Sequence, residues 1–277
     1  MDRSLKSIKI KLFITCCLVF VLHFATDFVR EHYLVLSIVE DSSFRLDKYV
    51  GLHHDIFETP EHGAHHGANP GASMIAALPC FVFKPVINLI DNYFSKSTRE
   101  LSAETSAVYK DHRQPRVKFY KQVRERGWDI KFGLVSAITM AFCMAPLSAL
   151  GAVVMFTALN RLGLSSRLSL WMAFLYALGT PVFFRTAYLN QNLMVGIFAF
   201  IGFVQLWQME DTSQIAVRKR FAIAGLLGGL SLLCDYSGLV PLVMLYGYGV
   251  IRRCDSVSLQ RALRESLWYF GGAIVPI

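Results

Sequence analysis

The chain has 277 residues, of which 54% are hydrophobic and only 17% charged, and its mean hydropathy is positive. Globular domains carry about 25% charged residues and lack apolar runs of about 20 residues, whereas such runs recur here along most of the chain. These values exclude a soluble domain, a disordered chain and a coiled coil, and they predict an all-α, polytopic integral membrane protein. The net charge of +8 is expected to lie in loops that flank the membrane, so no nucleic-acid partner is predicted.

Apolar segments that approach the length of a bilayer span follow one another in chain order. The first, residues 11–26, follows a basic start and lacks a small-x-small cleavage site, so it is interpreted as a retained anchor with a cytoplasmic N-terminus. A short helical hairpin is expected to turn at Asp235, because a carboxylate at the bilayer centre costs roughly 2.5 to 3.5 kcal/mol. The segments predicted after the first are 132–159, 168–184, 192–209, the hairpin at 221–251 and the start of a helix near Leu267.

Segment 72–90 decides the orientation of everything after it. Pro79 and Pro85 interrupt it, and if it does not cross the membrane, nine of the ten basic residues after residue 131 fall on the cytoplasmic side. We therefore expect a helix in the membrane interface. The predicted protein is a single multi-pass domain over residues 1–277 in the plasma or inner membrane, with an external loop at 27–131 that contains juxtamembrane helices. Because the chain stops inside an apolar run, a C-terminal part is expected to be missing.

Charged residues gather where the first span leaves the membrane. If the helix continues past Thr26, Asp27 and Glu31 lie one turn apart on the same face. Two carboxylates at one locus can deprotonate an acceptor hydroxyl or amine, or bind a divalent cation through oxygen ligands. Charged residues at the end of a span also act as ordinary interfacial anchors, and spacing alone favours that interpretation.

Six of the eight His lie between residues 32 and 66. His62 and either His65 or His66 have the spacing of zinc ligands on a helix. The neighbouring Pro60, Gly63 and Gly67 argue against a helix, so a loop at the mouth of a cavity is expected rather than a metal site.

A third polar group, Arg185 with Asn190, is expected at the external end of another span. Such an Arg can bind a lipid-linked phosphate through its guanidinium fork, or it can simply extend to the interface.

The order of these features resembles that of a known family. The segment from Thr26 to Leu34 contains Asp27, and His65-His66-Gly67-Ala68-Asn69-Pro70-Gly71 opens an amphipathic helix. Both resemble the first external loop of GT-C membrane glycosyltransferases, nearest to protein O-mannosyltransferases and lipid A aminoarabinose transferases. The family blocks read like Asp-Glu-x-x-Tyr and His- or Lys-Pro-Pro. This chain departs from them, because no Glu follows Asp27, Asn69 replaces one Pro, and Asn190 or Asn192 stands where an Asp is expected.

The resemblance implies an inverting transfer of a sugar from a polyprenyl-phosphate donor to a glycan, lipid or protein acceptor at the external face. It implies that Asp27 is the general base and that Glu31 orients the acceptor or binds a metal. No cofactor is assigned, and a divalent cation is left open. Lys84 and Arg185 would meet the leaving phosphate, and the full set of expected substrate contacts is His32, His65, His66, Asn69, Lys84, Arg185 and Asn190.

Two other classes compete with this one. A lipid or solute transporter should show repeated halves and polar, broken helices at the midplane, whereas the polar residues here lie at span ends and in one loop. A non-catalytic membrane protein of the same fold would lack the two carboxylates, which are present here.

Overall fold

The computed structural model describes residues 3–25, 27–102, 113–207 and 213–277. Helices hold 78% of the chain and strands 3%, which confirms the all-α class. Within these described ranges, two helices are long and apolar enough to cross a membrane, Gly71–Phe94 and Asp129–Arg161. The second corresponds to the span predicted at 132–159.

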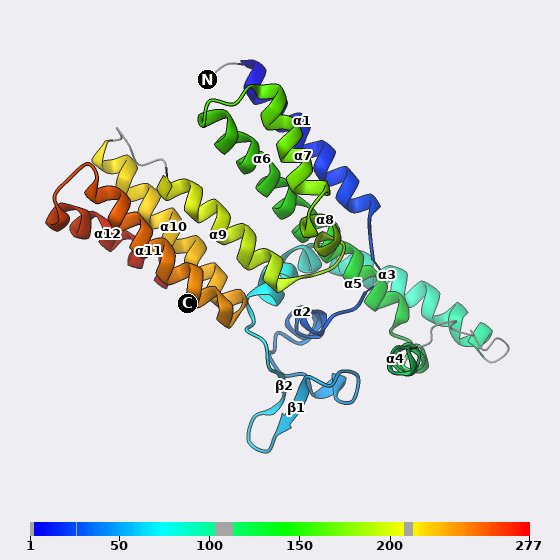
Figure 1. Cartoon of the computed structure of the whole chain (residues 1–277). Coiled ribbons are helices and arrows are strands. Elements are labelled where there is room, and N and C mark those ends of the chain that lie inside the picture. The colour runs from blue at the N-terminus through cyan, green and yellow to red at the C-terminus, as the bar shows by residue number, and fades with distance from the viewer. Residues whose placement is uncertain (1–2, 26, 103–112, 208–212) are drawn as a thin grey trace.

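One group of helices is built around that long helix, which consists of α5 (Asp129–Thr139), a π-helical turn (Met140–Met144) and α6 (Ala145–Arg161). Its α6 part packs against α1 (Arg3–Leu22) and α7 (Ser166–Leu178). The short α8 (Pro181–Thr186) then leads toward the second group (Figure 1).

The second group contains four helices, of which α10 packs against both α9 and α12 (Figure 1). The expected turn at Asp235 is confirmed, because α10 ends there and a 3-10 turn at Tyr236–Gly238 follows. Gly225 and Gly272 allow the close approach of α10 and α12: a Cβ on either one would collide with a carbonyl oxygen of the other helix. The helices are α9 (Gln191–Trp207), α10 (Gln214–Cys234), α11 (Leu239–Cys254) and α12 (Leu259–Ile274).

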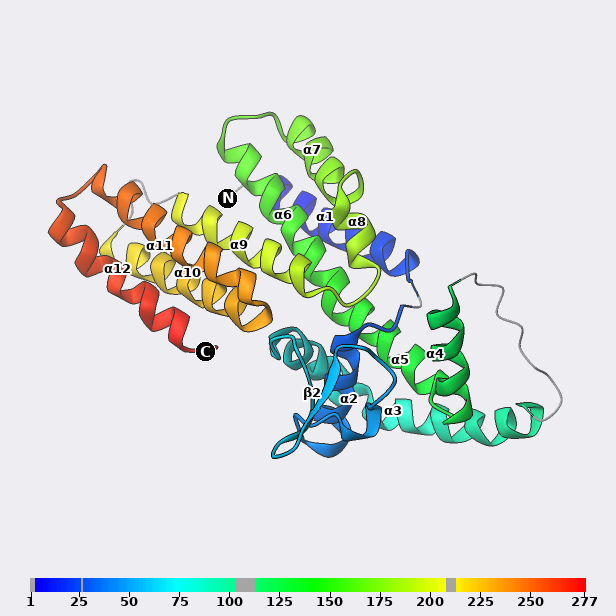
Figure 2. The same cartoon turned by 60° about the horizontal axis from the view of Figure 1, so that its bottom comes forward.

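A third layer lies across the ends of both groups (Figures 1 and 2). It contains α2 (Arg30–Asp41), a 3-10 turn (Asp47–Tyr49), strands β1 (Ile56–Thr59) and β2 (Gly63–His66), α3 (Gly71–Ser102) and α4 (Gln114–Glu125). The strands form an antiparallel hairpin, which confirms that the His-rich segment is not helical. α3 and α4 extend to the side away from α9–α12 (Figure 2).

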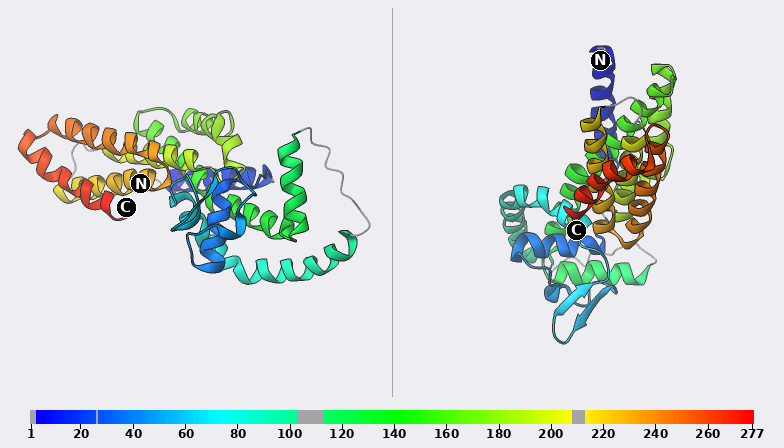
Figure 3. Two further views of the ribbon diagram at one scale, coloured as in Figure 1. Left: turned by 90° about the horizontal axis from the view of Figure 1, so that it is seen from below. Right: turned by 90° about the vertical axis from the view of Figure 1, so that its left-hand side faces the viewer.

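The prediction that the first helix continues past Thr26 is wrong. α1 ends at Leu22 and α2 begins at Arg30, and α2 runs crosswise to the upright α1 (Figure 3, right). The start of α2 at Arg30 has a local cause. Val29 is extended, and its N–H donates to Nδ1 of His32 at 3.0 Å, which caps the first turn of α2.

An aromatic cluster holds the third layer against α5. The rings of Phe28 and Phe132 stack with centroids 3.9 Å apart, and the buried Tyr33 meets both rings edge-on. These contacts fix the α1–α2 connection, which includes Asp27.

The expectation that Pro79 and Pro85 interrupt segment 72–90 is wrong, since α3 runs as one helix through both residues.

Candidate functional site

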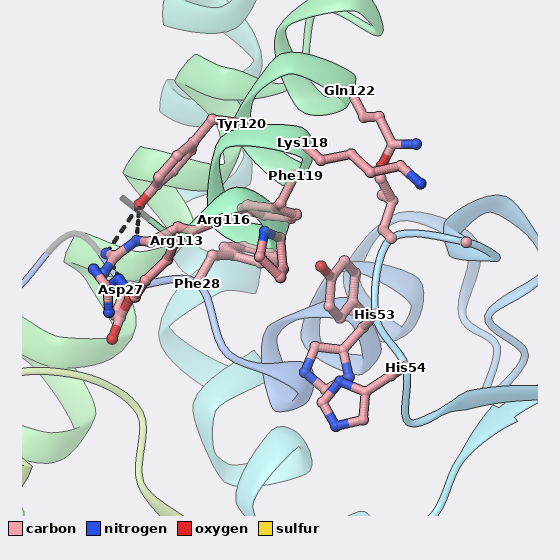
Figure 4. A pocket seen from close by; sticks show the side chains of 14 residues that line it. Asp27, Phe28, His53, His54, Arg113, Arg116, Lys118, Phe119, Tyr120 and Gln122 are labelled. Carbon is pink, nitrogen blue, oxygen red and sulfur yellow. Dashed lines mark hydrogen bonds and ion pairs between the residues drawn. The ribbon is translucent and has the colours of Figure 1, made fainter. Parts of the chain in front are cut away.

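Two cavities meet at the connection between α1 and α2. The first, which we call the cationic cavity, has a volume of about 550 Å³ (Figure 4). Its lining combines the carboxylate of Asp27 with three basic side chains from the start of α4, together with aromatic rings and two His. The lining residues are Asp27, Phe28, Tyr33, Gly51, Leu52, His53, His54, Arg113, Pro115, Arg116, Lys118, Phe119, Tyr120 and Gln122.

The second, which we call the amide cavity, has a volume of about 400 Å³. It shares Asp27, Phe28, His53 and His54 with the cationic cavity and adds a row of amide side chains from the start of α9. The lining residues are Asp27, Phe28, Val29, Arg30, Glu31, His53, His54, Asp55, Tyr188, Leu189, Asn190, Gln191 and Asn192. Asp27 is therefore exposed to two chemically different spaces.

The carboxylate of Asp27 is held from α4. Nη2 of Arg116 lies 2.8 Å from its Oδ1, and the same guanidinium donates to the hydroxyl of Tyr120 at 3.1 and 3.2 Å. From α5, Oγ of Ser136 donates to the backbone oxygen of Asp27 at 3.1 Å. The side chain of Asp27 remains half exposed, so the carboxylate is oriented and still accessible to a ligand.

Glu31 lines the amide cavity but is tied to a neighbour. Arg30 bridges two carboxylates, with Nε 3.0 Å from Oε1 of Glu31 and Nη1 2.8 Å from Oδ2 of Asp55. Burial raises the pKa of Glu31 above its usual value, although Arg30 opposes that shift. The hydrogen bond from Arg30 lowers the pKa of Asp55. Asp27 and Glu31 thus line the same cavity, but Asp27 lies in the α1–α2 connection and Glu31 in the first turn of α2. They do not share one helical face.

The amide row has a fixed orientation. Oδ1 of Asn190 accepts the N–H of Leu193 at 2.9 Å. Nε2 of Gln191 donates to Oδ2 of Asp235 at 2.6 Å, and because a carboxylate only accepts, the amide oxygen of Gln191 must point elsewhere. That buried oxygen has no hydrogen-bond partner among the described residues. Because this oxygen is itself buried, it is not a contact for a ligand in the amide cavity.

His53 and His54 lie on the boundary between the two cavities. Their rings stack with centroids 4.4 Å apart, and Nε2 of His54 lies 3.3 Å from Oδ1 of Asp55. Burial and the neighbouring His54 lower the pKa of His53. The sequence spacing suggests His62 with His65 or His66 as possible metal ligands, but the structure brings the potential ligand atoms of His53, His54 and Asp55 together instead.

His32 is not placed in either cavity. It is fully buried and stacks on Phe28, with Nδ1 accepting the N–H of Val29 and Nε2 lying 2.9 Å from Oγ1 of Thr139. Burial lowers the pKa of His32 to about 3, so the ring is neutral. Both ring nitrogens take part in hydrogen bonds within the protein, so neither is available to a ligand in the two cavities.

Five of the other expected substrate contacts also lie outside both cavities, and four of these serve the fold. Nε2 of His65 donates to the backbone of His62, and Nδ1 of His66 accepts the N–H of Ala68, while burial lowers the pKa of His66 to about 4. Asn69 and Lys84 donate to carbonyl oxygens at the ends of α10 and α2, those of Leu232 and Val39.

Arg185 is exposed at the end of α8 and does not line a cavity, although Asn190 five residues later does. The Arg and Lys side chains that line the cationic cavity are instead Arg113, Arg116 and Lys118. The spacing of Arg116 and Tyr120, one helical turn apart, is the sequence signal for these residues, whereas the sequence prediction places them only within the external loop at 27–131.

The arrangement can accept an anionic head group on one side of Asp27 and a hydroxyl-rich or amine ligand on the other. Arginine and lysine groups suit phosphate, and amide side chains suit ligands with hydroxyl or amine groups. In comparisons with family models, curated proteins and solved structures, nothing matches this chain.

Proposed function

We propose that the chain is the membrane module of a glycosyltransferase that moves a sugar from a polyprenyl-phosphate donor to an acceptor at the external face of the membrane. The observation that carries the proposal is the position of Asp27 between the cationic cavity and the amide cavity. The lipid phosphate occupies the cationic cavity, and the acceptor hydroxyl or amine occupies the amide cavity. A general base has to reach both the acceptor proton and the space of the transferred sugar.

The proposed reaction is a single displacement. A carboxylate oxygen of Asp27 takes the acceptor proton as the acceptor oxygen or nitrogen attacks the anomeric carbon from the face opposite the phosphate. The bond between that carbon and the phosphate oxygen breaks, and the electron pair leaves with the polyprenyl phosphate. Arg113, Arg116 and Lys118 stabilise the charge that develops on the leaving group.

Arg116 has a second role in this scheme. Its guanidinium donates to Oδ1 of Asp27 and so occupies that oxygen. A phosphate in the cationic cavity competes for the same guanidinium, so binding of the donor frees this carboxylate oxygen for proton transfer.

Contacts across α3 support the proposed orientation. α3 connects the β-hairpin to α4, and elements before and after it touch one another: Arg126 donates to the backbone oxygen of Lys48 at 3.1 Å, and Lys131 lies 2.8 Å from Glu40. Segments in contact are on the same side of a membrane. This favours α3 as an interfacial helix, although residues Gly71–Phe94 are long enough to cross.

The shorter apolar helices remain part of the proposal. α1, α7 and α9–α12 accompany the 129–161 helix as further spans of a multi-pass protein, with the N-terminus cytoplasmic. Broad apolar exposure supports it, since Leu22, Trp171 and Val240 are each more than 60% exposed.

The proposal is tested with radiolabelled donors in membranes that contain the protein. Label should pass to an acceptor from a polyprenyl-phosphate sugar and not from the corresponding nucleotide sugar. Transfer from neither donor above the level of membranes that lack the protein would contradict it.

A non-catalytic membrane protein of the same architecture is the second candidate. The ion pair between Asp27 and Arg116 favours it, because a contact within the fold already occupies one oxygen of this carboxylate. The two candidates differ in the effect of Asp27→Asn, which removes sugar transfer only if Asp27 is the base.

A further inference from the structure

A cluster of potential metal ligands lies where the cationic cavity meets the amide cavity. His53, His54 and Asp55 each offer one ligand atom, and these atoms all lie within 4.8 Å of one another. His54 is the most exposed of the three, with 86% of its side chain accessible, so its ring can rotate toward an ion that arrives from the cavity side. The proposed transfer reaction assigns no task to this cluster.

The closest pair already has the separation of two ligands on one ion. Nε2 of His54 and Oδ1 of Asp55 are 3.3 Å apart. Two ligands at about 2.1 Å from a tetrahedral zinc ion are about 3.4 Å apart. The most distant ligand atoms of the cluster would have to approach by at most about 1.4 Å to reach that separation.

Further contacts orient the ligands, as the outer partners of metal sites do. Nη1 of Arg30 holds Oδ2 of Asp55 at 2.8 Å, which leaves Oδ1 for an ion. The N–H of Asp55 donates to Nδ1 of His53 at 3.1 Å, and an ion that takes this lone pair displaces one neutral hydrogen bond.

A third imidazole, that of His66, lies beside the cluster. His66 is 9% exposed, its electrostatic neighbours include Arg30, His53 and Asp55, and its Nε2 has no hydrogen-bond partner among the described residues. A buried ring nitrogen without a partner is costly, and an ion or an ion-bound water supplies one. The donor set therefore contains imidazoles and one carboxylate.

We propose that His53, His54 and Asp55 bind one zinc-class divalent cation at the boundary of the two cavities. Imidazole nitrogens select zinc, cobalt, nickel or copper, whereas magnesium and calcium prefer oxygen ligands. Three protein ligands leave a fourth position open to water or to a ligand in either cavity. The site does not depend on the proposed sugar transfer.

The test is a metal titration of the purified full chain in detergent after treatment with a chelator. Zn²⁺ is titrated against a chromophoric competitor, and Co²⁺ is added in parallel to record its ligand-field absorption. The expected result is one ion per chain, with affinity at least tenfold weaker in His53→Ala, His54→Ala and Asp55→Asn. His54→Ala is the safest of these for folding, because the side chain is largely in solvent.

His62→Ala is the matched control, because His62 is also an exposed His beside a carboxylate, with Nε2 4.0 Å from Glu61. It should leave the affinity unchanged. Less than about a tenth of an equivalent of bound Zn²⁺, or an equal loss in His54→Ala and His62→Ala, would overturn the proposal. Asp27→Asn should retain the metal, so a failure of the transfer reaction is distinguished from a failure of the site.

Discussion

Nη2 of Arg116 lies 2.8 Å from Oδ1 of Asp27, although the two residues are 89 positions apart in the chain. The contact brings the start of α4 over the α1–α2 connection and places a guanidinium between the proposed base and the proposed phosphate site. A ligand in the cationic cavity would therefore meet the same guanidinium that holds Asp27.

The first prediction concerns donor binding. Arg116→Ala should weaken binding of a polyprenyl phosphate about tenfold, because a hydrogen bond to a charged group contributes about 1.5 kcal/mol or more. Lys118→Ala should weaken it about threefold, since an exposed charge contributes less than about 1 kcal/mol.

Lys121→Ala is the control for both variants. Lys121 is exposed on the same helix, one turn from Lys118, and does not line the cavity. Binding is measured with a fluorescent polyprenyl phosphate in nanodiscs. Equal affinities of Lys118→Ala and Lys121→Ala would argue against the cationic cavity as the lipid-phosphate site.

Local patterns were sufficient for the helical class, the 129–161 helix, the turn at Asp235 and the non-helical His segment. They failed where a contact between distant residues decides the structure. His32 looks like a site residue in sequence, but Thr139, 107 positions away, occupies one of its nitrogens. The break between α1 and α2 depends on the same ring, because Nδ1 of His32 accepts the N–H of Val29 at the start of α2. Likewise, nothing within ten residues of Asp27 indicates that Arg116 will hold it.

A second prediction addresses the packing of α10 on α12. Gly272→Ala should destabilise the protein by about 1–3 kcal/mol, because the added Cβ meets the carbonyl oxygen of Ala222 and the helices must separate. Gly271→Ala is the matched control: beyond its chain neighbours and the nearby backbone of its own helix, a Cβ at Gly271 meets no heavy atom within 4 Å in the described part of the chain. It should be neutral or stabilising by at most about 1 kcal/mol. Thermal unfolding in detergent measures both, and equal midpoints would refute the close approach.

A third prediction follows from the neutral, buried His32. Its pKa is about 3 in the folded protein and about 6.5 in the unfolded chain, so the unfolded state binds the proton first as the pH falls. Stability should therefore decrease below pH 6.5, with His32 responsible for about 2 kcal/mol between pH 7 and pH 5. The decrease should continue down to about pH 3.

The measurement compares unfolding midpoints at pH 7 and pH 5 for the wild-type protein and His32→Gln. Gln cannot take up the proton, so the variant should lose less stability across this interval than the wild-type protein. An identical pH dependence in both proteins would mean that His32 is not the titrating group.

The fourth prediction concerns topology. Single Cys residues that replace Glu61 in the hairpin and Lys121 in α4 should both react with a membrane-impermeant maleimide added from outside. A Cys that replaces Ser213, before α10, should react only after permeabilisation. Reaction of Glu61→Cys and Lys121→Cys from opposite sides would mean that α3 crosses the membrane and that all later segments are inverted.

The central claim is that Asp27 is the catalytic base, and Asp27→Asn tests it most directly. The substitution preserves the shape of the side chain and removes the basic carboxylate oxygen, and loss of a positioned general base typically costs about 10² to 10⁴ in rate. Turnover of a polyprenyl-phosphate sugar should fall at least a hundredfold, while expression, membrane insertion and donor binding stay close to wild type. Retention of more than about a tenth of wild-type turnover would contradict the account, because a tenfold loss is only about 1.4 kcal/mol and can arise from an altered hydrogen bond.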